Sequence, residues 1–262
     1  MLRALYTAAS GMEAQQLNID TIAHNLANIN TAGYKLRKAQ FQDLLYQNIR
    51  QAGAANTANT DIPVGLQVGL GTKPVATEII LTQGDFSSTG NQLDVVIQGQ
   101  GFFQVRQVNG QIAYTRNGSF HMNRDGMLVT AEGDQLDPQI TIPQDQVGIT
   151  IGADGTVSVL QADQTQPQQV GRIEIALFQN PAGLQSIGKN LLMPTQASGE
   201  PVTGTPGENG LGTLMSGFIE QSNVSVVEEM VNMIISQRAY ESNSKVIRTA
   251  DEMFTQANNV VR

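Results

Sequence analysis

Apolar residues recur with a period of seven near the start of the chain. Leu5, Met12, Ile19 and Leu26 are seven residues apart, and Ile22 falls between the last two. Seven residues make about two helical turns, so these side chains share one stripe of a predicted helix. Gly33 suits the left-handed conformation that ends many helices, and we expect the chain to leave the helix there.

The C-terminal segment repeats this pattern more strictly. Its apolar stripe consists of Val226, Met230, Met233, Tyr240, Ile247, Phe254 and Val261. Asn223 or Ser225 is suited to cap the start of this second helix. So narrow a stripe does not stabilise a lone helix, so both stripes need partners and are candidate assembly interfaces. Either the two helices pair as an antiparallel coiled coil with faces left for other subunits, or both pack on the middle of the chain.

The middle of the chain has the pattern of a β structure. All nine prolines lie between Pro63 and Pro206, and no glycine follows Gly217. Because proline and glycine break helices and favour turns, the outline is helix–β–helix. Apolar or alternating runs predict strands at 93–97, 112–115, 119–122, 127–130, 149–151, 157–160 and 172–178.

Turn signals separate several of these strands. Asn109–Gly110, Asn117–Gly118 and Asp125–Gly126 are dipeptides typical of hairpin turns, because both residues tolerate positive φ. Residues 195–212 are rich in glycine, proline and threonine and predict a loop. Residues 51–60 carry no apolar periodicity and predict, on their own, a flexible segment. The predicted fold class is therefore α+β, with paired terminal helices and a β-rich middle of short antiparallel strands.

The composition is unusually poor in charge and rich in amides. Only 15% of residues are charged, whereas Gln and Asn number 29 and 19. The net charge is −8, and the acidic excess lies in the middle, which argues against nucleic-acid binding. We interpret the small cluster of Lys35, Arg37 and Lys38 as a solvated face. The chain has no cysteine, which excludes disulfides and thiolate metal sites.

Neither end nor middle predicts membrane insertion, because no apolar run is long enough to span a bilayer. The N-terminus does not match a secretory signal either, since Glu13 closes its apolar stretch. If the protein leaves the cytoplasm, we expect a route without signal cleavage.

A search for catalytic or ligand-binding chemistry yields no candidate. His24 and His121 have no partner at metal spacing and are expected to be structural or solvent-facing. The segment Gly65–Lys73 reverses the order of lysine and hydroxyl that a phosphate loop needs, and a turn is the better reading. Asp125 and Asp134 adjoin glycines and suit turns. We therefore predict no catalytic residue, no metal site and no cofactor.

The segment that ends the first helix carries a specific motif. Asn25, Asn28, Thr31, Gly33 and Tyr34 lie in a run up to Lys35 that resembles the signature of the bacterial flagellar rod and hook family. The segments 93–103, 114–130 and 222–258 resemble the family as well. The resemblance covers nearly the whole chain and, with its length, is strongest to the distal-rod branch.

This resemblance implies a structural subunit of the flagellar distal rod rather than an enzyme. It implies a helical inner domain of residues 1–34 with 218–262 around the export channel, a connector at 35–72 and a β-rich outer domain at 73–217. It also implies a self-assembling rigid tube that transmits torque to the hook. The implied location is the basal body, where the rod crosses the periplasm.

The implied partners are further copies of the chain, other rod proteins, hook subunits, the P- and L-ring proteins and the flagellar type III export apparatus. Tyr46, Asn56, Asp61 and Pro63 mark the rod-specific segment, which the family associates with stiffness. Two alternatives remain open: a hook or proximal-rod paralogue, and a non-flagellar β-domain enzyme or binding module. The last would need a polar pocket with perturbed titratable groups.

Overall fold

The computed structural model describes residues 2–51, 55–57, 60–61, 64–162 and 166–260. Contacts divide the chain into two compact units. The helical unit comprises Met1–Leu26, Arg37–Glu78 and Ser225–Arg262, and the β domain comprises Ala27–Leu36 and Ile79–Val224. The chain therefore passes between the units four times. The expected inner and outer domains concern the assembled protein, and their boundaries stay a prediction.

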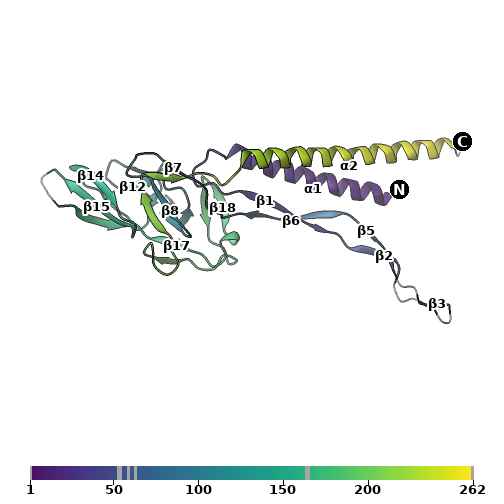
Figure 1. Cartoon of the computed structure of the whole chain (residues 1–262), viewed down its shortest axis with the longest axis horizontal. Helices are drawn as coiled ribbons and strands as arrows, with labels where there is room; N and C mark the ends of the chain where they lie inside the picture. The colour runs from purple at the N-terminus through teal and green to yellow at the C-terminus, as the bar shows by residue number, and fades with distance from the viewer. Residues whose placement is uncertain (1, 52–54, 58–59, 62–63, 163–165, 261–262) are drawn as a thin grey trace. The chain divides into compact units, whose positions relative to one another are not determined.

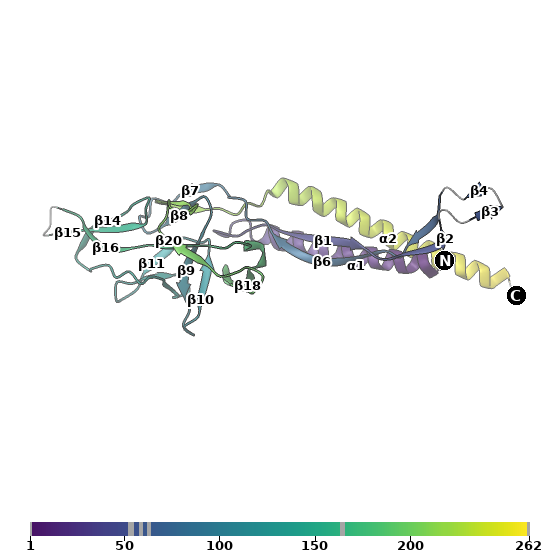
Figure 2. The same cartoon turned by 90° about the horizontal axis from the view of Figure 1, so that it is seen from below.

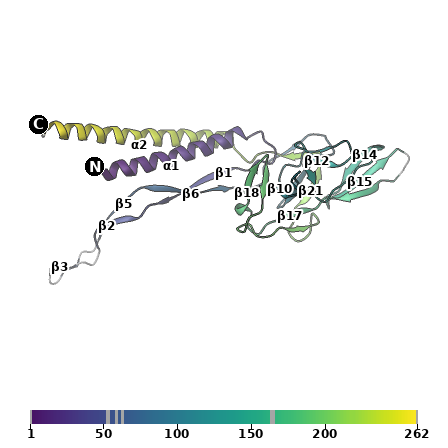
Figure 3. The ribbon, with the colours of Figure 1, turned by 180° about the vertical axis from the view of Figure 1, so that it is seen from behind.

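Two long helices form the larger part of the helical unit. Helix α1 spans Leu2–Ala27 and helix α2 spans Val226–Val260. They lie side by side and antiparallel, with the two chain ends on the same side (Figures 1 and 3). This confirms that the terminal helices pair with each other. At the start of α2 the Ser225 hydroxyl accepts a hydrogen bond from the Glu228 N–H at 3.5 Å, so Ser225 is the capping residue.

A long two-stranded ribbon completes the helical unit (Figure 2). Strand β1 (Arg37–Asp43) pairs with β6 (Thr72–Ile79), β2 (Tyr46–Arg50) with β5 (Leu66–Gly69), and β3 (Ala55–Thr57) with β4 (Thr60–Asp61). The segment 51–60, which its composition alone predicts to be flexible, contains β3 and the first residue of β4. Strand pairing satisfies backbone groups and does not require the apolar alternation on which that expectation depended.

The β domain contains the remaining strands, all in antiparallel pairs. They are β7 (Phe86–Ser88), β8 (Val95–Gln98), β9 (Phe102–Arg106), β10 (Ile112–Thr115), β11 (Phe120–Met122), β12 (Leu128–Thr130), β13 (Gln135–Leu136), β14 (Gln146–Ile151), β15 (Thr156–Gln161), β16 (Gln168–Arg172), β17 (Ile175–Leu177), β18 (Gln185–Gly188), β19 (Leu191–Met193), β20 (Val202–Gly204), β21 (Thr213–Ser216) and β22 (Phe218–Glu220). A short 3-10 helix, η1, spans Pro181–Gly183. Strand β20 interrupts the loop predicted at 195–212.

One large sheet organises the β domain. Its order is β11-β12-β13-β9-β10-β19-β18, and β17 also pairs with β9 and with β20. Strands β14, β15 and β16 form a second sheet, while β8 pairs with β21 and β7 with β22. This confirms the predicted fold class of terminal helices with a middle of short antiparallel strands.

Strand β9 is buried on both faces. Successive residues of a strand point to opposite sides, so Phe103 enters the main apolar core and Phe102 a smaller one. Phe103 packs edge-to-face on Phe120, with ring centroids 5.1 Å apart. On the other side Phe178 packs against Phe102 and Tyr114. The aromatic run of this strand therefore joins the two cores.

Two of the three predicted turns are confirmed. Gly110 and Gly126 have φ of 83° and 78° in the β9–β10 and β11–β12 hairpins. The hairpin predicted at Asn117–Gly118 is wrong, because β10 pairs with β9 and β19 whereas β11 pairs with β12. Glycine is needed at 118 for a different reason: a Cβ there would lie 1.7 Å from the Val95 carbonyl oxygen.

Candidate assembly site

The two helices contact each other through polar and small residues. Asn25 Nδ2 donates to Glu229 Oε2 at 2.9 Å, and Asn18 Nδ2 donates to Ser236 Oγ at 2.8 Å. One further step along, a Cβ on Gly11 would lie 2.8 Å from Asn243 Nδ2. Each contact is seven residues from the last on both helices. The pair therefore has coiled-coil spacing, with polar or small residues at these three contacts.

The residues of α2 that bond to α1 are not members of the predicted stripe. Glu229, Ser236 and Ala250 are buried, and each lies three residues after a member of the stripe. Of the stripe itself, Met233, Ile247 and Phe254 are half-buried, whereas Val226, Met230 and Tyr240 are exposed. Val261 lies outside the described residues. On α1, Ile22 is buried and Leu5, Met12, Ile19 and Leu26 are half-buried.

The start of α2 instead carries an uncovered apolar stripe. Val227, Met230, Val231 and Ile234 are 72%, 51%, 50% and 52% exposed. Their spacing of three, four and seven residues places them on one helix face, about opposite to Glu229 and Ser236. We call these four residues the α2 apolar stripe. A contiguous exposed apolar surface of this kind is typical of interaction sites.

The family motif has a structural role at the end of α1. The Asn25 amide donates to the Arg37 carbonyl oxygen at 2.8 Å and accepts from the Arg37 N–H at 3.0 Å. Asn25 thus bonds both backbone groups of the residue that begins β1, as a neighbouring strand would.

The rest of the motif forms the turn that follows. Thr31 Oγ1 donates to Asn28 Oδ1 at 3.3 Å, and the Tyr34 N–H donates to the Thr31 carbonyl at 3.2 Å. Tyr34 is buried. Gly33 has the expected left-handed conformation, with φ of 70°, and a Cβ there would lie 2.6 Å from the Asn117 nitrogen. No other residue fits this position without moving backbone.

A buried ionic cluster lies in the β domain, and the sequence did not predict it. Glu220 Oε1 accepts from Lys35 Nζ at 2.6 Å, and Glu220 Oε2 accepts from Arg116 Nε at 2.7 Å. The side chains of Lys35 and Arg116 are each 6% exposed and that of Glu220 is 1% exposed. The interpretation of Lys35 as part of a solvated face is therefore wrong. We call Lys35, Arg116 and Glu220 the Glu220 cluster.

Two cations around one anion explain the electrostatics of this cluster. Burial favours the neutral form of Glu220, but the charges of Arg116 and Lys35 outweigh it and hold the pKa of Glu220 below its ordinary value. Burial also lowers the pKa of Lys35; Glu220 opposes this effect, while Arg116 adds to it. Two cations thus hold the Glu220 carboxylate in its charged form. Lys35 has one anionic partner, Glu220, which it shares with Arg116.

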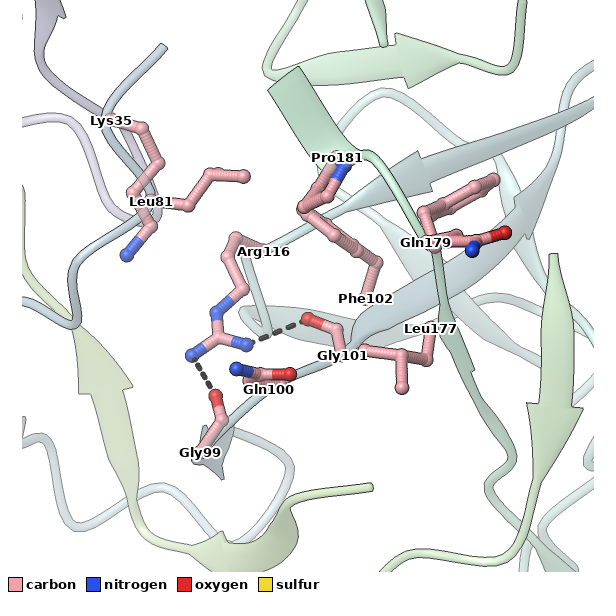
Figure 4. A pocket seen from close by; sticks show the side chains of 11 residues that line it. Lys35, Leu81, Gly99, Gln100, Gly101, Phe102, Arg116, Leu177, Gln179 and Pro181 are labelled. Carbon is pink, nitrogen blue, oxygen red and sulfur yellow. Dashed lines mark hydrogen bonds between the residues drawn. The ribbon is translucent and has the colours of Figure 1, made fainter. Parts of the chain in front are cut away.

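A pocket of about 240 Å³ adjoins the cluster. Phe102, Leu177 and Pro181 line one side of it, and Leu81 and the stem of Lys35 line the other (Figure 4). Arg116 donates across its floor to the carbonyls of Gly99 and Gly101 at 2.8 and 2.6 Å. Both cations are already paired with Glu220. Burial lowers the pKa of Lys35 and pairing lowers that of Glu220, so both shifts have a structural cause and do not by themselves identify a catalytic group.

The rod-specific segment is in the ribbon. Tyr46 is exposed at the start of β2, and its ring packs over Gly69 of β5, which lies opposite it. Asn56 and Asp61 belong to β3 and β4. Pro63 lies outside the described residues. His24 and His121, which carried no expected chemistry, are exposed.

Three family models match the chain. Residues 5–35 match the flagella basal body rod protein model, residues 96–159 the flagellar hook protein FlgE/F/G D1 domain, and residues 215–260 the flagellar basal body rod FlgEFG protein C-terminal model. The first and last coincide with α1 and its motif and with α2, and the second with the core of the β domain. Paired terminal helices that flank such a domain in the sequence define the class of flagellar axial structural proteins.

Full-length relatives agree with these matches. The flagellar basal-body rod protein FlgG of Borreliella burgdorferi is 50% identical over 100% of both chains. FlgG of Buchnera aphidicola from Schizaphis graminum is 49% identical over 97% of each chain, and FlgG of Bacillus subtilis is 39% identical over 100% of each.

The chain therefore belongs to the flagellar basal-body rod protein family. This confirms the predicted structural subunit of the flagellar distal rod and its location in the flagellar basal body. The family is a structural one. Among the residues that the structure describes, neither helix is both long and apolar enough to cross a membrane.

Proposed function

We propose that this rod subunit assembles with further copies of itself into a rigid tube that encloses the export channel and carries torque to the hook. It does so by packing alone, without catalysis. Its further partners are other rod proteins, hook subunits, the P- and L-ring proteins and the flagellar type III export apparatus. The predicted helical stripes contribute to the surfaces through which copies meet by their exposed residues, such as Met230.

The uncovered α2 apolar stripe is the observation that carries this proposal. Within one chain, α1 bonds Glu229 and Ser236 of α2, whereas Val227, Met230, Val231 and Ile234 are at least half exposed. Burying an aliphatic side chain of this size gains about 1.5–3 kcal/mol of free energy. Exposing four such side chains on one helix face therefore costs free energy, which burial against a partner surface recovers. A helix of another copy supplies such a surface.

Substitutions in the stripe test this directly. We expect Ile234→Asp to abolish incorporation into rods, because a carboxylate would be buried without a partner at the contact. Ser242→Asp is the matched control, since it adds the same charge at an exposed position of α2 without removing apolar surface. Rods are counted by electron microscopy of isolated basal bodies from cells that carry only the variant gene.

The thermal unfolding of each purified variant separates assembly from folding. Ile234 is 52% exposed, so its replacement should leave monomer unfolding unchanged. Normal rods with Ile234→Asp, or equal loss with Ser242→Asp, would contradict the role of the stripe.

We further propose that the ribbon around Tyr46, Asn56, Asp61 and Pro63 gives the rod its stiffness. In support, β2 exposes Tyr46 and Ile49, and a two-stranded ribbon is only marginally stable in water. Neighbouring copies would cover these residues in the rod. Deleting residues 47–65 should give rods that still form but curve, as seen by electron microscopy; rods that stay straight would refute this role.

A further inference from the structure

Three segments of the β domain adjoin the connections to the helical unit. The chain changes units after residues 26, 36, 78 and 224. On the β-domain side, three of these four connections adjoin the segments 33–36, 80–84 and 220–223. They are far apart in the sequence, so only non-covalent contacts hold them together.

Glu220 contacts both other segments. Its Oε1 accepts from Lys35 Nζ at 2.6 Å and from the Gly84 N–H at 3.0 Å, and its backbone carbonyl accepts from the Gly33 N–H at 2.8 Å. Its Oε2 accepts from Arg116, which belongs to the core of the domain. The Glu220 carboxylate thus bonds both other segments and joins all three to Arg116 in the core of the domain.

Asn223 contacts the same two segments. Its Oδ1 accepts from the Leu36 N–H at 2.7 Å, and its Nδ2 donates to the carbonyls of Ile80 and Thr82 at 2.9 and 3.1 Å. Lys35 Nζ also donates to the Thr82 carbonyl, at 2.8 Å. The Ile80 N–H donates to the Leu36 carbonyl at 2.8 Å, so the segments 33–36 and 80–84 are also bonded directly.

We propose that Lys35, Glu220 and Asn223 form a clasp that makes these three segments open and close as one block. In the rod, force on any one of the three connections that adjoin these segments is then shared by all three. This second statement rests on the proposed drive-shaft function. The three side chains are positioning residues, because they act by holding backbone segments.

The physical reason for a single block is the burial of the charges. Releasing one segment would break its bonds to Glu220 or Lys35 and leave a buried charge short of partners. The hydrogen bonds of a buried polar network strengthen one another, and a buried group that loses its partner is costly. Partial opening is therefore disfavoured relative to full opening. Segments held only by separate backbone bonds would open one at a time.

Hydrogen exchange on the purified full-length chain tests the block. Lys35→Met removes Nζ but leaves Glu220 paired with Arg116 and Gly84. The amides of Leu36 and Ile80 keep their acceptors, Asn223 Oδ1 and the Leu36 carbonyl. A single block predicts about tenfold faster exchange at Leu36, Ile80 and Gly84 together. Faster exchange at Gly84 alone would overturn the proposal.

Lys189→Met is the matched control for this measurement. It breaks the exposed Lys189–Glu132 pair, 2.9 Å long, in the same domain. We expect no change at Leu36, Ile80 or Gly84. An equal acceleration in the control would also overturn the block, because the effect would then not depend on the clasp.

Swimming under load tests the sharing of force. The wild-type, Lys35→Met and Lys189→Met chains are each produced in cells that lack their own copy. We expect equal numbers of rods and, for Lys35→Met alone, a steeper loss of swimming speed as the viscosity of the medium rises. An equal decline in all three strains would overturn force sharing. If the wild-type chain restores no rods, the proposed function fails instead.

Discussion

The α1–α2 pair and the β domain bury their surfaces in opposite ways. In the β domain, Phe103, Phe120, Ile97 and Leu128 are almost completely buried in an apolar core. Between the helices, the repeating contacts are Asn25 with Glu229, Asn18 with Ser236, and Gly11 with Asn243. The β domain is therefore complete in one chain. The repeating contacts between the helices are polar or small, and the α2 apolar stripe is left exposed.

The largest effect is expected in the β-domain core. Phe103→Ala should destabilise this domain by about 3–5 kcal/mol, because it leaves a cavity against Phe120. Denaturant unfolding followed by hydrogen exchange at the β9 amides and by helical circular dichroism measures the two units separately. The comparison predicts that the helical signal keeps its midpoint. A shift of both signals by the same amount would show one cooperative structure instead.

The next effect concerns the Glu220 cluster. Glu220→Gln leaves two buried cations without an anion and should cost about 3–5 kcal/mol of β-domain stability at neutral pH. Chemical denaturation of the wild type and the variant gives this difference. Equal stability would mean that the two cations find solvent or other partners in the variant.

The same carboxylate predicts a dependence on pH. The folded state lowers the pKa of Glu220 below 4.5, so its contribution is complete above that value and is lost as the pH falls through the lowered folded-state value. Wild-type stability should therefore fall more steeply on acidification than that of Glu220→Gln. Parallel pH profiles from about pH 7 to pH 3 would contradict this assignment.

A smaller effect is expected between the helices. Ser236→Ala removes the acceptor of Asn18 and should cost about 0.5–1.5 kcal/mol of helical-unit stability. Thermal unfolding followed by circular dichroism measures it, with Ser242→Ala as a control whose hydroxyl bonds only its own helix. A cost above that of Phe103→Ala would reverse the comparison.

The smallest effect is expected at Gly11. Alanine favours a helix over glycine by about 0.5–1 kcal/mol, and its Cβ would meet only the movable end of the Asn243 side chain. Gly11→Ala should therefore raise the midpoint of helical unfolding slightly. A lowered midpoint would show that the close approach at Gly11 matters more than the conformational freedom of glycine.

The sequence predicted elements better than interfaces. Strand β10 spans the predicted residues Ile112–Thr115, whereas α1 ends at Ala27, six residues before the expected stop at Gly33. The period of seven in α2 is real, but the residues that α1 covers begin at Glu229, three positions after Val226. Apolar spacing reports burial against every partner and does not say which face the chain covers itself.

The Glu220 cluster was missed for a different reason. Lys35, Arg116 and Glu220 are charged, and charged residues are rarely buried, so pattern analysis assigned Lys35 to the surface. Glu220 is 104 residues from Arg116 and 185 from Lys35. Only the position of Lys35 and Arg116 inside family-like segments gave a signal, and without the fold it had no physical interpretation.

The seven-residue step between the helices has one more consequence. If α2 slid by one step along α1, Asn25 would meet Ser236, Asn18 would meet Asn243, and Gly11 would meet Ala250. Every contact would again be polar or small, so the helix surfaces alone barely distinguish the two registers. The register is instead fixed at one end of each helix. Asn25 bonds Arg37 near the end of α1, and Ser225 caps the start of α2. The two helices are thus aligned by contacts at one end of each helix rather than by contacts along their length.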